Sequence, residues 1–147
     1  MANFIDLDFA DGEYRFALPL AQIDELQRKC GCGIGQLYAR TLKGASRQGG
    51  DLVLSPALAE FYALDLLETV RQGLIGGAQG TVDEQPVKVS PGDARRLVAN
   101  YLQNRPLVEA WEFAVVILSA VIVGYDPPGD EGNGEAAASE TQETPAS

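Results

Sequence analysis

The chain has 147 residues, of which 46% are hydrophobic, and this length and composition suit one compact domain with its own apolar core. It carries 21 acidic and 11 basic residues, and the resulting net charge of −10 argues against binding to nucleic acid or to an anionic membrane surface. It contains no histidine, which removes the commonest general acid–base group, histidine-dependent triads and most zinc sites.

Residues 3–18 predict a β-hairpin. Apolar residues alternate with polar or small ones on both sides of Asp11-Gly12: Ile5, Leu7 and Phe9 before it, and Tyr14, Phe16 and Leu18 after it. An Asp-Gly pair favours a two-residue type I′ turn. That turn would pair Phe9 with Tyr14, Leu7 with Phe16 and Ile5 with Leu18. All six side chains then share one face, which we expect helices to cover.

Two helices should follow the hairpin. The first opens at Pro19 and ends at Gly31, and its inner stripe would consist of Leu20, Ile23, Leu26 and Cys30. The second runs from Ile34 to Leu42. Residues 44–50, GASRQGG, indicate a flexible surface loop. Ser55-Pro56 then predicts a short helix, whose inward side chains would be Leu58, Phe61 and Tyr62.

The stretch from Leu64 to Gly77 predicts the central helix of the core. Asp65 is expected to cap its start, with Glu68 completing a capping box. Arg71 would pair with one of these carboxylates, and Gly76-Gly77 would stop the helix. The buried stripe would consist of Leu66, Leu67, Val70 and Leu74. A phosphate-binding glycine loop is the alternative, but no strand precedes this run and no Gly-Lys-Ser/Thr follows it.

Two more helices are predicted after a weakly patterned region, residues 78–89, which is extended around 86–89. Ser90-Pro91 marks a helix start, and the inner residues would be Ala94, Leu97, Val98 and Tyr101. Arg105-Pro106 breaks the chain, and the last helix should run from Leu107 to Gly124. Its segment 113–123, FAVVILSAVIV, has no charge but is shorter than the ~20 residues of a membrane span, which favours a buried core helix.

The last helix has more apolar faces than a one-sided core contact needs. One stripe consists of Leu107, Trp111, Ala114, Leu118 and Ile122. Among the residues on the other faces, we predict a candidate interaction surface at Val108, Val116 and Val123, first for self-association and then for partner helices. The alternative is complete burial of this helix inside the monomer.

The composition changes at Asp126. Residues 126–147 contain six acids, no base and no aromatic residue, so ordering them would cost backbone entropy with little apolar surface to bury. We therefore expect a compact domain over 1–125 and a disordered acidic tail over 126–147. The predicted fold class is α+β, mainly α, with an N-terminal β-hairpin packed on a bundle of about five short helices.

No catalytic constellation emerges from the remaining polar residues. The carboxylates are expected to be solvated or to cap helices, and they do not converge on one site. Cys30 and Cys32 are too close for a comfortable disulfide and form only half a metal site, so reduced thiols in the cytoplasm are the simplest interpretation. We predict no enzyme activity, no cofactor and no metal.

Several of these segments together resemble one protein family. They are the hairpin with DGEYRFAL, then LAQIDELQRKCGCGIGQLYARTLKG, then LDLLETVRQGLIGG, and a helix ending LVANYLQNRPL before the apolar helix. The chain is similar to the small tail-assembly chaperones of bacterial gene transfer agents and related prophages, also described as phage tail tube proteins of gene transfer agents. The resemblance covers residues 3–124, and its most specific motif is ETVRQGLIGG at Glu68–Gly77.

This resemblance implies a non-enzymatic role in building a phage-like tail. Proteins of this family are similar to chaperones that coat the long helical tape-measure protein and present it for polymerisation of the tail tube. The implied partners are the tape-measure protein and other tail-assembly proteins, together with further copies of the chain, in the cytoplasm of the producer cell. The alternative is a structural tail or tube-associated subunit that stays in the particle.

Overall fold

The computed structural model describes residues 1–127 and contains five α-helices and two β-sheets in this range. The helices are α1 (Leu20–Cys30), α2 (Ile34–Leu42), α3 (Ala63–Gly77), α4 (Pro91–Tyr101) and α5 (Leu107–Ile122). The strands are β1 (Phe4–Phe9), β2 (Gly12–Ala17), β3 (Ala45–Gln48), β4 (Asp51–Leu54), β5 (Gln79–Val82) and β6 (Gln85–Lys88). The predicted fold class is confirmed. Except for residues 126–127, the predicted disordered tail lies outside the described residues.

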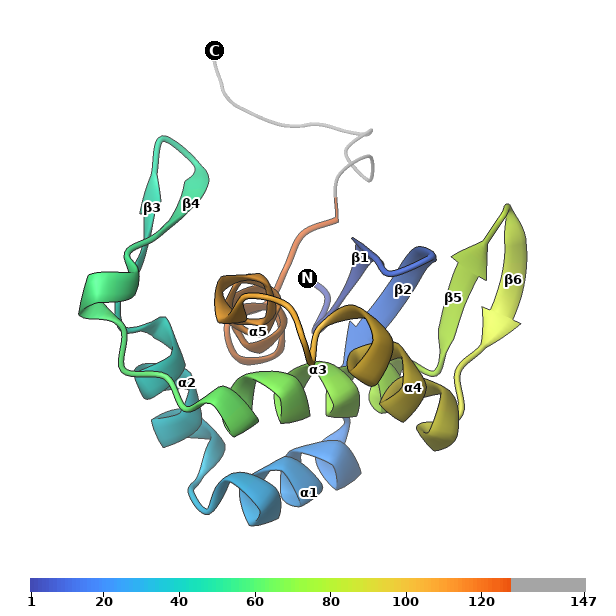
Figure 1. Cartoon of the computed structure of the whole chain (residues 1–147), viewed down its shortest axis with the longest axis horizontal. Coiled ribbons are helices and arrows are strands. Elements are labelled where there is room, and N and C mark those ends of the chain that lie inside the picture. The colour runs from blue at the N-terminus through green and yellow to red at the C-terminus, as the bar shows by residue number, and fades with distance from the viewer. Residues whose placement is uncertain (128–147) are drawn as a thin grey trace.

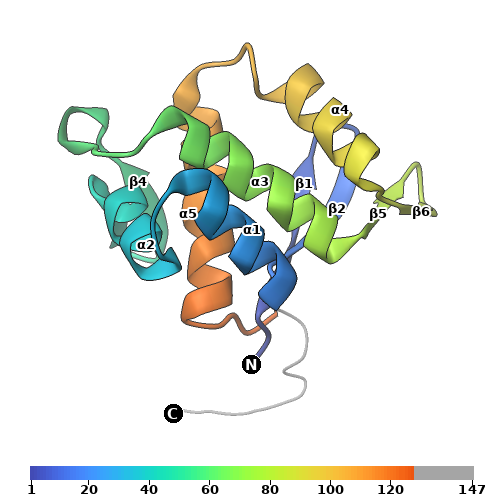
Figure 2. The same ribbon diagram turned by 90° about the horizontal axis from the view of Figure 1, so that it is seen from below.

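Helix α3 occupies the middle of the molecule. It lies between α1 and α5, and it also packs against α4 and β2 (Figure 1). The arm formed by β3 and β4 lies toward the N-terminal end of α3, with α2. The larger sheet lies toward the C-terminal end of α3, where β1 and β2 run beside the helix and β5 and β6 extend past it (Figure 2). Three residues of the predicted stripe, Leu66, Val70 and Leu74, are fully buried, whereas Leu67 is only partly buried. The central place assigned to this helix is therefore confirmed.

The hairpin forms on the expected faces but in a different register. Phe9 pairs with Gly12, Leu7 with Tyr14 and Ile5 with Phe16, so the turn consists of Ala10 and Asp11. The predicted register was wrong by two residues, a shift that leaves every side chain on the same face of a strand. Gly12 is therefore the first residue of β2, and β5 passes so close to it that an added Cβ would lie 2.3 Å from the oxygen of Thr81.

The structure contains more strand than the sequence pattern indicated. Strands β5 and β6 extend the hairpin into an antiparallel sheet of order β1-β2-β5-β6, with a turn at Asp83 and Glu84 where both φ angles are positive. Residues 44–50, predicted as a loop, instead enter a second hairpin in which Ala45 pairs with Leu54 and Gln48 with Asp51. We call this β3–β4 hairpin the arm.

The two ends of α3 differ from the prediction. Its N-cap residue is Tyr62, without a side-chain hydrogen bond, so the Asp65–Glu68 capping box does not form. Gly76 and Gly77 lie inside the helix, and the left-handed residue that ends it is Ala78, at φ 59°.

These two glycines permit close packing on β2. An added Cβ would lie 2.0 Å from the carbonyl oxygen of Ala17 at Gly76, and 1.9 Å from that of Arg15 at Gly77. Glycine is required at both positions because a Cβ would collide with the backbone of β2. Neither position has a positive φ angle.

The other helices follow the prediction with local exceptions. Gly31 ends α1 at φ 72°, but Leu20 is 79% exposed and does not belong to the inner stripe. The helix expected after Ser55 is a single 3₁₀ turn, Pro56–Leu58, and the side chains of Leu58 and Tyr62 are exposed. Of the inner residues predicted for α4, Ala94, Leu97 and Val98 are buried, whereas Tyr101 is exposed.

Candidate interaction surface

One sector of α5 reaches the molecular surface. With 3.6 residues per turn, Val108, Glu112, Val116, Ser119 and Val123 fall within a sector of about 80°. Val108 is 42% exposed and Val123 is 63% exposed, and Val116 is partly buried between them. We call this line of five residues the α5 face. Most of the opposite side of α5 is core, and the buried residues of the helix are Ala110, Trp111, Ala114, Val115, Ile117, Leu118 and Ala120.

A groove of about 310 Å³ runs along one side of the α5 face. Tyr38 and Leu42 of α2 form part of its wall, and Leu52 of the arm forms another part. Val123 and Ser119 belong to both the groove and the α5 face, and the hydroxyl of Tyr38 lies 3.4 Å from that of Ser119. We call it the arm groove.

A second groove, of about 490 Å³, lies on the other side of α5, where the β1–β2 turn meets the end of α4. Aromatic rings line it: the ring centroid of Phe9 lies 5.2 Å from that of Phe113 and 6.3 Å from that of Tyr101. The ion pair between Arg105 and Glu109, at 3.0 Å, also lines it. We call this second cavity the aromatic groove.

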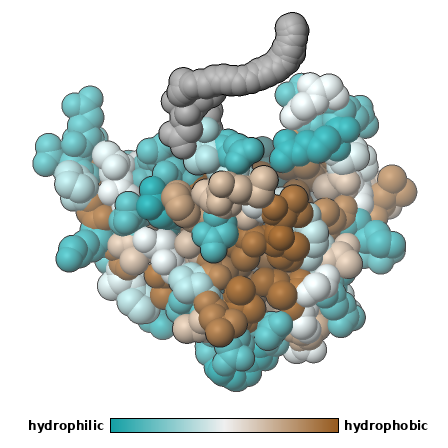
Figure 3. All heavy atoms as spheres, turned by 180° about the vertical axis from the view of Figure 1, so that it is seen from behind, coloured by the Kyte–Doolittle hydropathy of each residue, from teal (hydrophilic) through white to brown (hydrophobic). Residues whose placement is uncertain are grey.

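Apolar residues also gather where α5 ends. Figure 3, which views the molecule from behind, shows a broad apolar area on this side. Ile122 and Val123 are exposed at the end of α5. The side chain of Met1 packs against Gly124, whose φ is 104°, so that an added Cβ would lie 2.3 Å from the Met1 sulfur. The α5 face thus meets further apolar surface at its C-terminal end.

The polar residues of the central motif stabilise the fold. Arg71 pairs with Glu68 at 2.5 Å, as the sequence indicated, and Gln72 Nε2 donates to the same carboxylate at 2.9 Å. Asp65 does not join this pair, because its carboxylate accepts a hydrogen bond from Arg40 Nε at 2.8 Å. The guanidinium of Arg40 also lies 4.1 Å from the ring centroid of Tyr62. The contacts of Arg40 join α2 to the start of α3, whereas the Arg71–Glu68–Gln72 contacts lie within α3.

The two cysteines are free thiols, and Cys30 is poorly suited to act as a nucleophile. Burial, and then a hydrogen bond and charge repulsion from Asp65, raise the pKa of Cys30 to about 12, so the reactive thiolate is scarce at neutral pH. Within residues 1–127 there is no group of three or more His, Cys, Asp or Glu side chains that could hold a metal ion. None of the helices in the same range combines the length and apolarity that crossing a bilayer requires.

These features define a small, mainly helical α+β domain whose most prominent surface features are a partly exposed helix and the two grooves beside it. The chain belongs to the family described as phage tail tube protein, GTA-gp10, which matches residues 3–124. The resemblance read from the sequence is therefore confirmed, and the protein is related to the tails of phages and gene transfer agents. No curated protein and no solved structure matches the chain significantly.

Proposed function

We propose that the protein is a tail-assembly chaperone that binds helices of the tape-measure protein on the α5 face. The observation that carries this proposal is the line of valines on the α5 face, exposed at Val108 and Val123 and partly buried at Val116, beside the arm groove. Membership of a phage-tail family supports a partner among tail proteins. The binding would occur in the producer cell, before the tail is complete.

The dimensions of the α5 face suit a helical partner. From Val108 to Val123 the helix rises about 22 Å, the length of a partner helix of about 15 residues. The five positions of the α5 face are spaced by three or four residues, the spacing of contacts in helix-in-groove recognition, and three of the five are valines. Glu112 and Ser119 interrupt the valines, which limits the apolar area exposed before the partner binds.

Co-expression of the full chain with its cognate tape-measure protein, followed by pull-down, tests this function. Val108→Glu and Val123→Glu should each reduce recovery of the tape-measure protein at least tenfold and leave the melting temperature unchanged. Val116→Glu tests the less exposed middle of the line. Leu64→Glu is the matched control, because Leu64 is an exposed apolar residue on a different helix, α3. Undiminished recovery with both exposed-valine variants would reject the α5 face as the binding site.

The second candidate is a structural subunit of the tail tube. The family description and the four-stranded antiparallel sheet favour it. Mass spectrometry of purified particles separates the two functions. A tube subunit is present in many copies per particle, whereas a chaperone is needed for tail formation but absent from the finished particle.

A further inference from the structure

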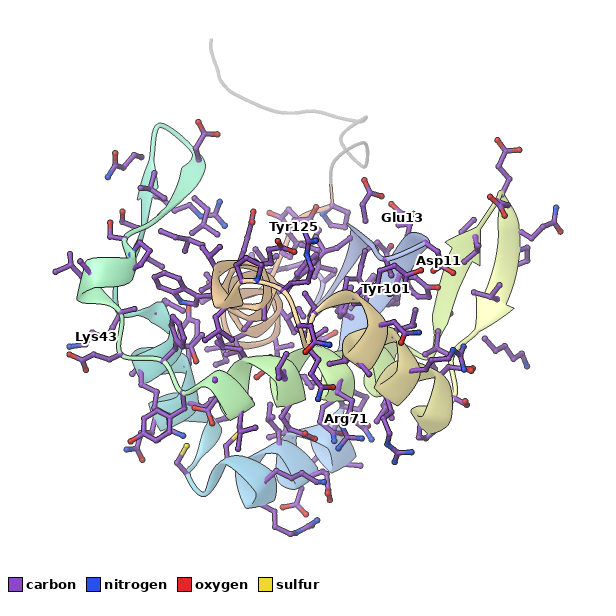
Figure 4. All side chains as sticks on the ribbon, viewed as in Figure 1. Asp11, Glu13, Lys43, Arg71, Tyr101 and Tyr125 are labelled. Carbon is purple, nitrogen blue, oxygen red and sulfur yellow. The ribbon has the colours of Figure 1, made fainter. Side chains whose placement is uncertain are left out.

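Strand β1 has a free edge that is ready to pair with another strand. The sheet order β1-β2-β5-β6 leaves one side of β1 without a neighbouring strand among the described residues. Ala2 and Tyr125 exchange two backbone hydrogen bonds of 2.8 Å on this side, just before β1 begins. Figure 4 shows Tyr125 between the end of α5 and β1.

The register identifies which backbone groups point outward along this edge. The pair that closes a two-residue hairpin, here Phe9 and Gly12, exchanges hydrogen bonds, and every second pair after it does the same. Phe4, Asp6 and Asp8 therefore direct their N–H and C=O groups away from β2. The outward pairing of Ala2 agrees with this alternation.

The two edges of the sheet differ in protection. The outer strand β6 carries Pro86 and Lys88, two residue types that discourage strand addition. Strand β1, with the sequence FIDLDF, contains neither a proline nor a lysine. The β1 edge can therefore accept an added strand more readily than the β6 edge.

The charges on β1 select the partner. Asp8 lies directly opposite Glu13 on β2, and Asp11 follows in the turn. Like charges facing one another across strands are destabilising. Among the described residues of this sheet, Arg15 Nε pairs with Asp6 Oδ1 at 2.9 Å. Asp8 and Glu13 have no such ion pair among these residues. A basic side chain placed opposite Asp8 would relieve this repulsion.

The aromatic groove lies at the end of the same edge. Asp8, Phe9 and Ala10, at the end of β1 and in the turn, line it together with Phe113 and Tyr101. A strand added along β1 directs alternate side chains to opposite faces. Residues next to the basic one would therefore point toward the aromatic groove, where an apolar side chain fits.

We propose that the β1 edge binds an extended segment of another protein in which basic and apolar residues alternate. Backbone pairing with Phe4, Asp6 and Asp8 provides affinity, and Asp8 and the aromatic groove provide selectivity. A second β1 strand is a poor occupant, because antiparallel pairing centred on Asp6 brings carboxylates face to face. The acidic residues 126–147 are disfavoured for the same reason. This proposal does not depend on the proposed chaperone function.

A blocked hexapeptide that alternates lysine with valine tests the proposal on the full chain. We expect saturable binding in an NMR titration, with the largest amide shifts in β1 and around the aromatic groove. Two control peptides are matched to it: one has glutamate in place of lysine, and one carries N-methyl groups on alternate amides, which blocks strand pairing but keeps the charge. Both controls should bind at least tenfold more weakly.

Variants of Asp8 complete the experiment. Asp8→Asn should weaken binding of the lysine peptide severalfold, and Asp8→Pro, which removes an outward N–H, should abolish binding while the melting temperature stays within a few degrees. Equal binding of the N-methylated peptide, shifts confined to α5, or an absence of binding at millimolar peptide would overturn the proposal. Pull-down of the tape-measure protein is a separate readout, so failure here leaves the chaperone proposal untouched.

Discussion

Single glycines set how closely α3 approaches the sheet. Gly76 and Gly77 face the carbonyl groups of Ala17 and Arg15 at distances that no Cβ tolerates. Gly35, in the exposed part of α2, has nothing within 4 Å of an added Cβ. A side chain has no room at Gly76 or Gly77 but has room at Gly35, and substitution by alanine tests this difference.

Gly77→Ala should lower the free energy of unfolding by about 3 kcal/mol, because the helix must move away from the backbone of β2. Gly35→Ala, the matched control, should raise the free energy of unfolding by up to ~1 kcal/mol through better helix propensity. Urea denaturation of both variants measures the difference. Equal effects of the same sign would mean that α3 does not approach β2 as closely as the structure shows.

Asp93 gives the start of α4 a pH dependence. Its carboxylate accepts a hydrogen bond from the backbone N–H of Ser90 at 3.0 Å, which, with the Ser90 side chain and Arg96, lowers the pKa of Asp93. A carboxyl whose pKa is lower in the folded state stabilises the fold above its unfolded pKa, about 3.9, and loses this effect as the pH falls. Asp93→Asn should melt below the parent at pH 7, and the gap should close below about pH 4. A gap independent of pH would contradict this assignment.

At the scale of elements, local signals were sufficient for some helices and hairpins but not for all. Helix α2 and the start of α4 at Ser90-Pro91 were predictable because all their determinants lie within a few residues of sequence. The start of α3 was not, because Asp65 pairs with Arg40, 25 positions earlier, instead of capping its own helix. The arm was missed because the polar strand β3 has no apolar alternation to mark it.

The candidate surface was also predictable only in part. Its three valines could be named from the apolar excess of α5, but the sequence could not decide which side of that helix stays uncovered. The answer depends on where α2, α3 and the sheet dock, and those contacts link residues far apart in the chain. Trp111, for example, donates its indole N–H to the carbonyl of Thr41, 70 positions earlier, at 2.7 Å. The two grooves arise only from this assembly.

Within α3, the buried stripe should matter far more than the ion pair beside it. Leu74→Asp removes about 1.5–3 kcal/mol of apolar burial and adds the cost of desolvating a charge, so the domain should unfold. Arg71→Ala removes one ion pair with Glu68 and should cost about 1 kcal/mol. Thermal melts compare them, and a Leu74→Asp variant that melts like the parent would contradict the central position of α3.

At the scale of the whole molecule, charge is distributed unevenly along the chain. Residues 126–147 carry six of the ten net negative charges and no base. Deleting them should leave the melting temperature unchanged, because Tyr125 and its pairing with Ala2 are retained. The truncated chain should be less soluble near neutral pH. A clear fall in the melting temperature would show that this segment contributes to the stability of the domain.

The pairing of Ala2 with Tyr125 nearly closes residues 2–125 into a ring, because the Cα atoms of a hydrogen-bonded antiparallel pair lie about 5.5 Å apart. The chain can therefore be joined at Ala2 and Tyr125 and opened at another surface loop, and the packing of the domain should stay the same. A circular permutant that joins Tyr125 to Ala2 by a short linker and opens between Gly49 and Gly50, at the tip of the arm, should melt within a few degrees of residues 1–125. Its failure to fold would show that the arm turn must be continuous. If the permutant folds, its new termini lie at the tip of the arm, and a continuous linker replaces the two chain segments beside the start of β1.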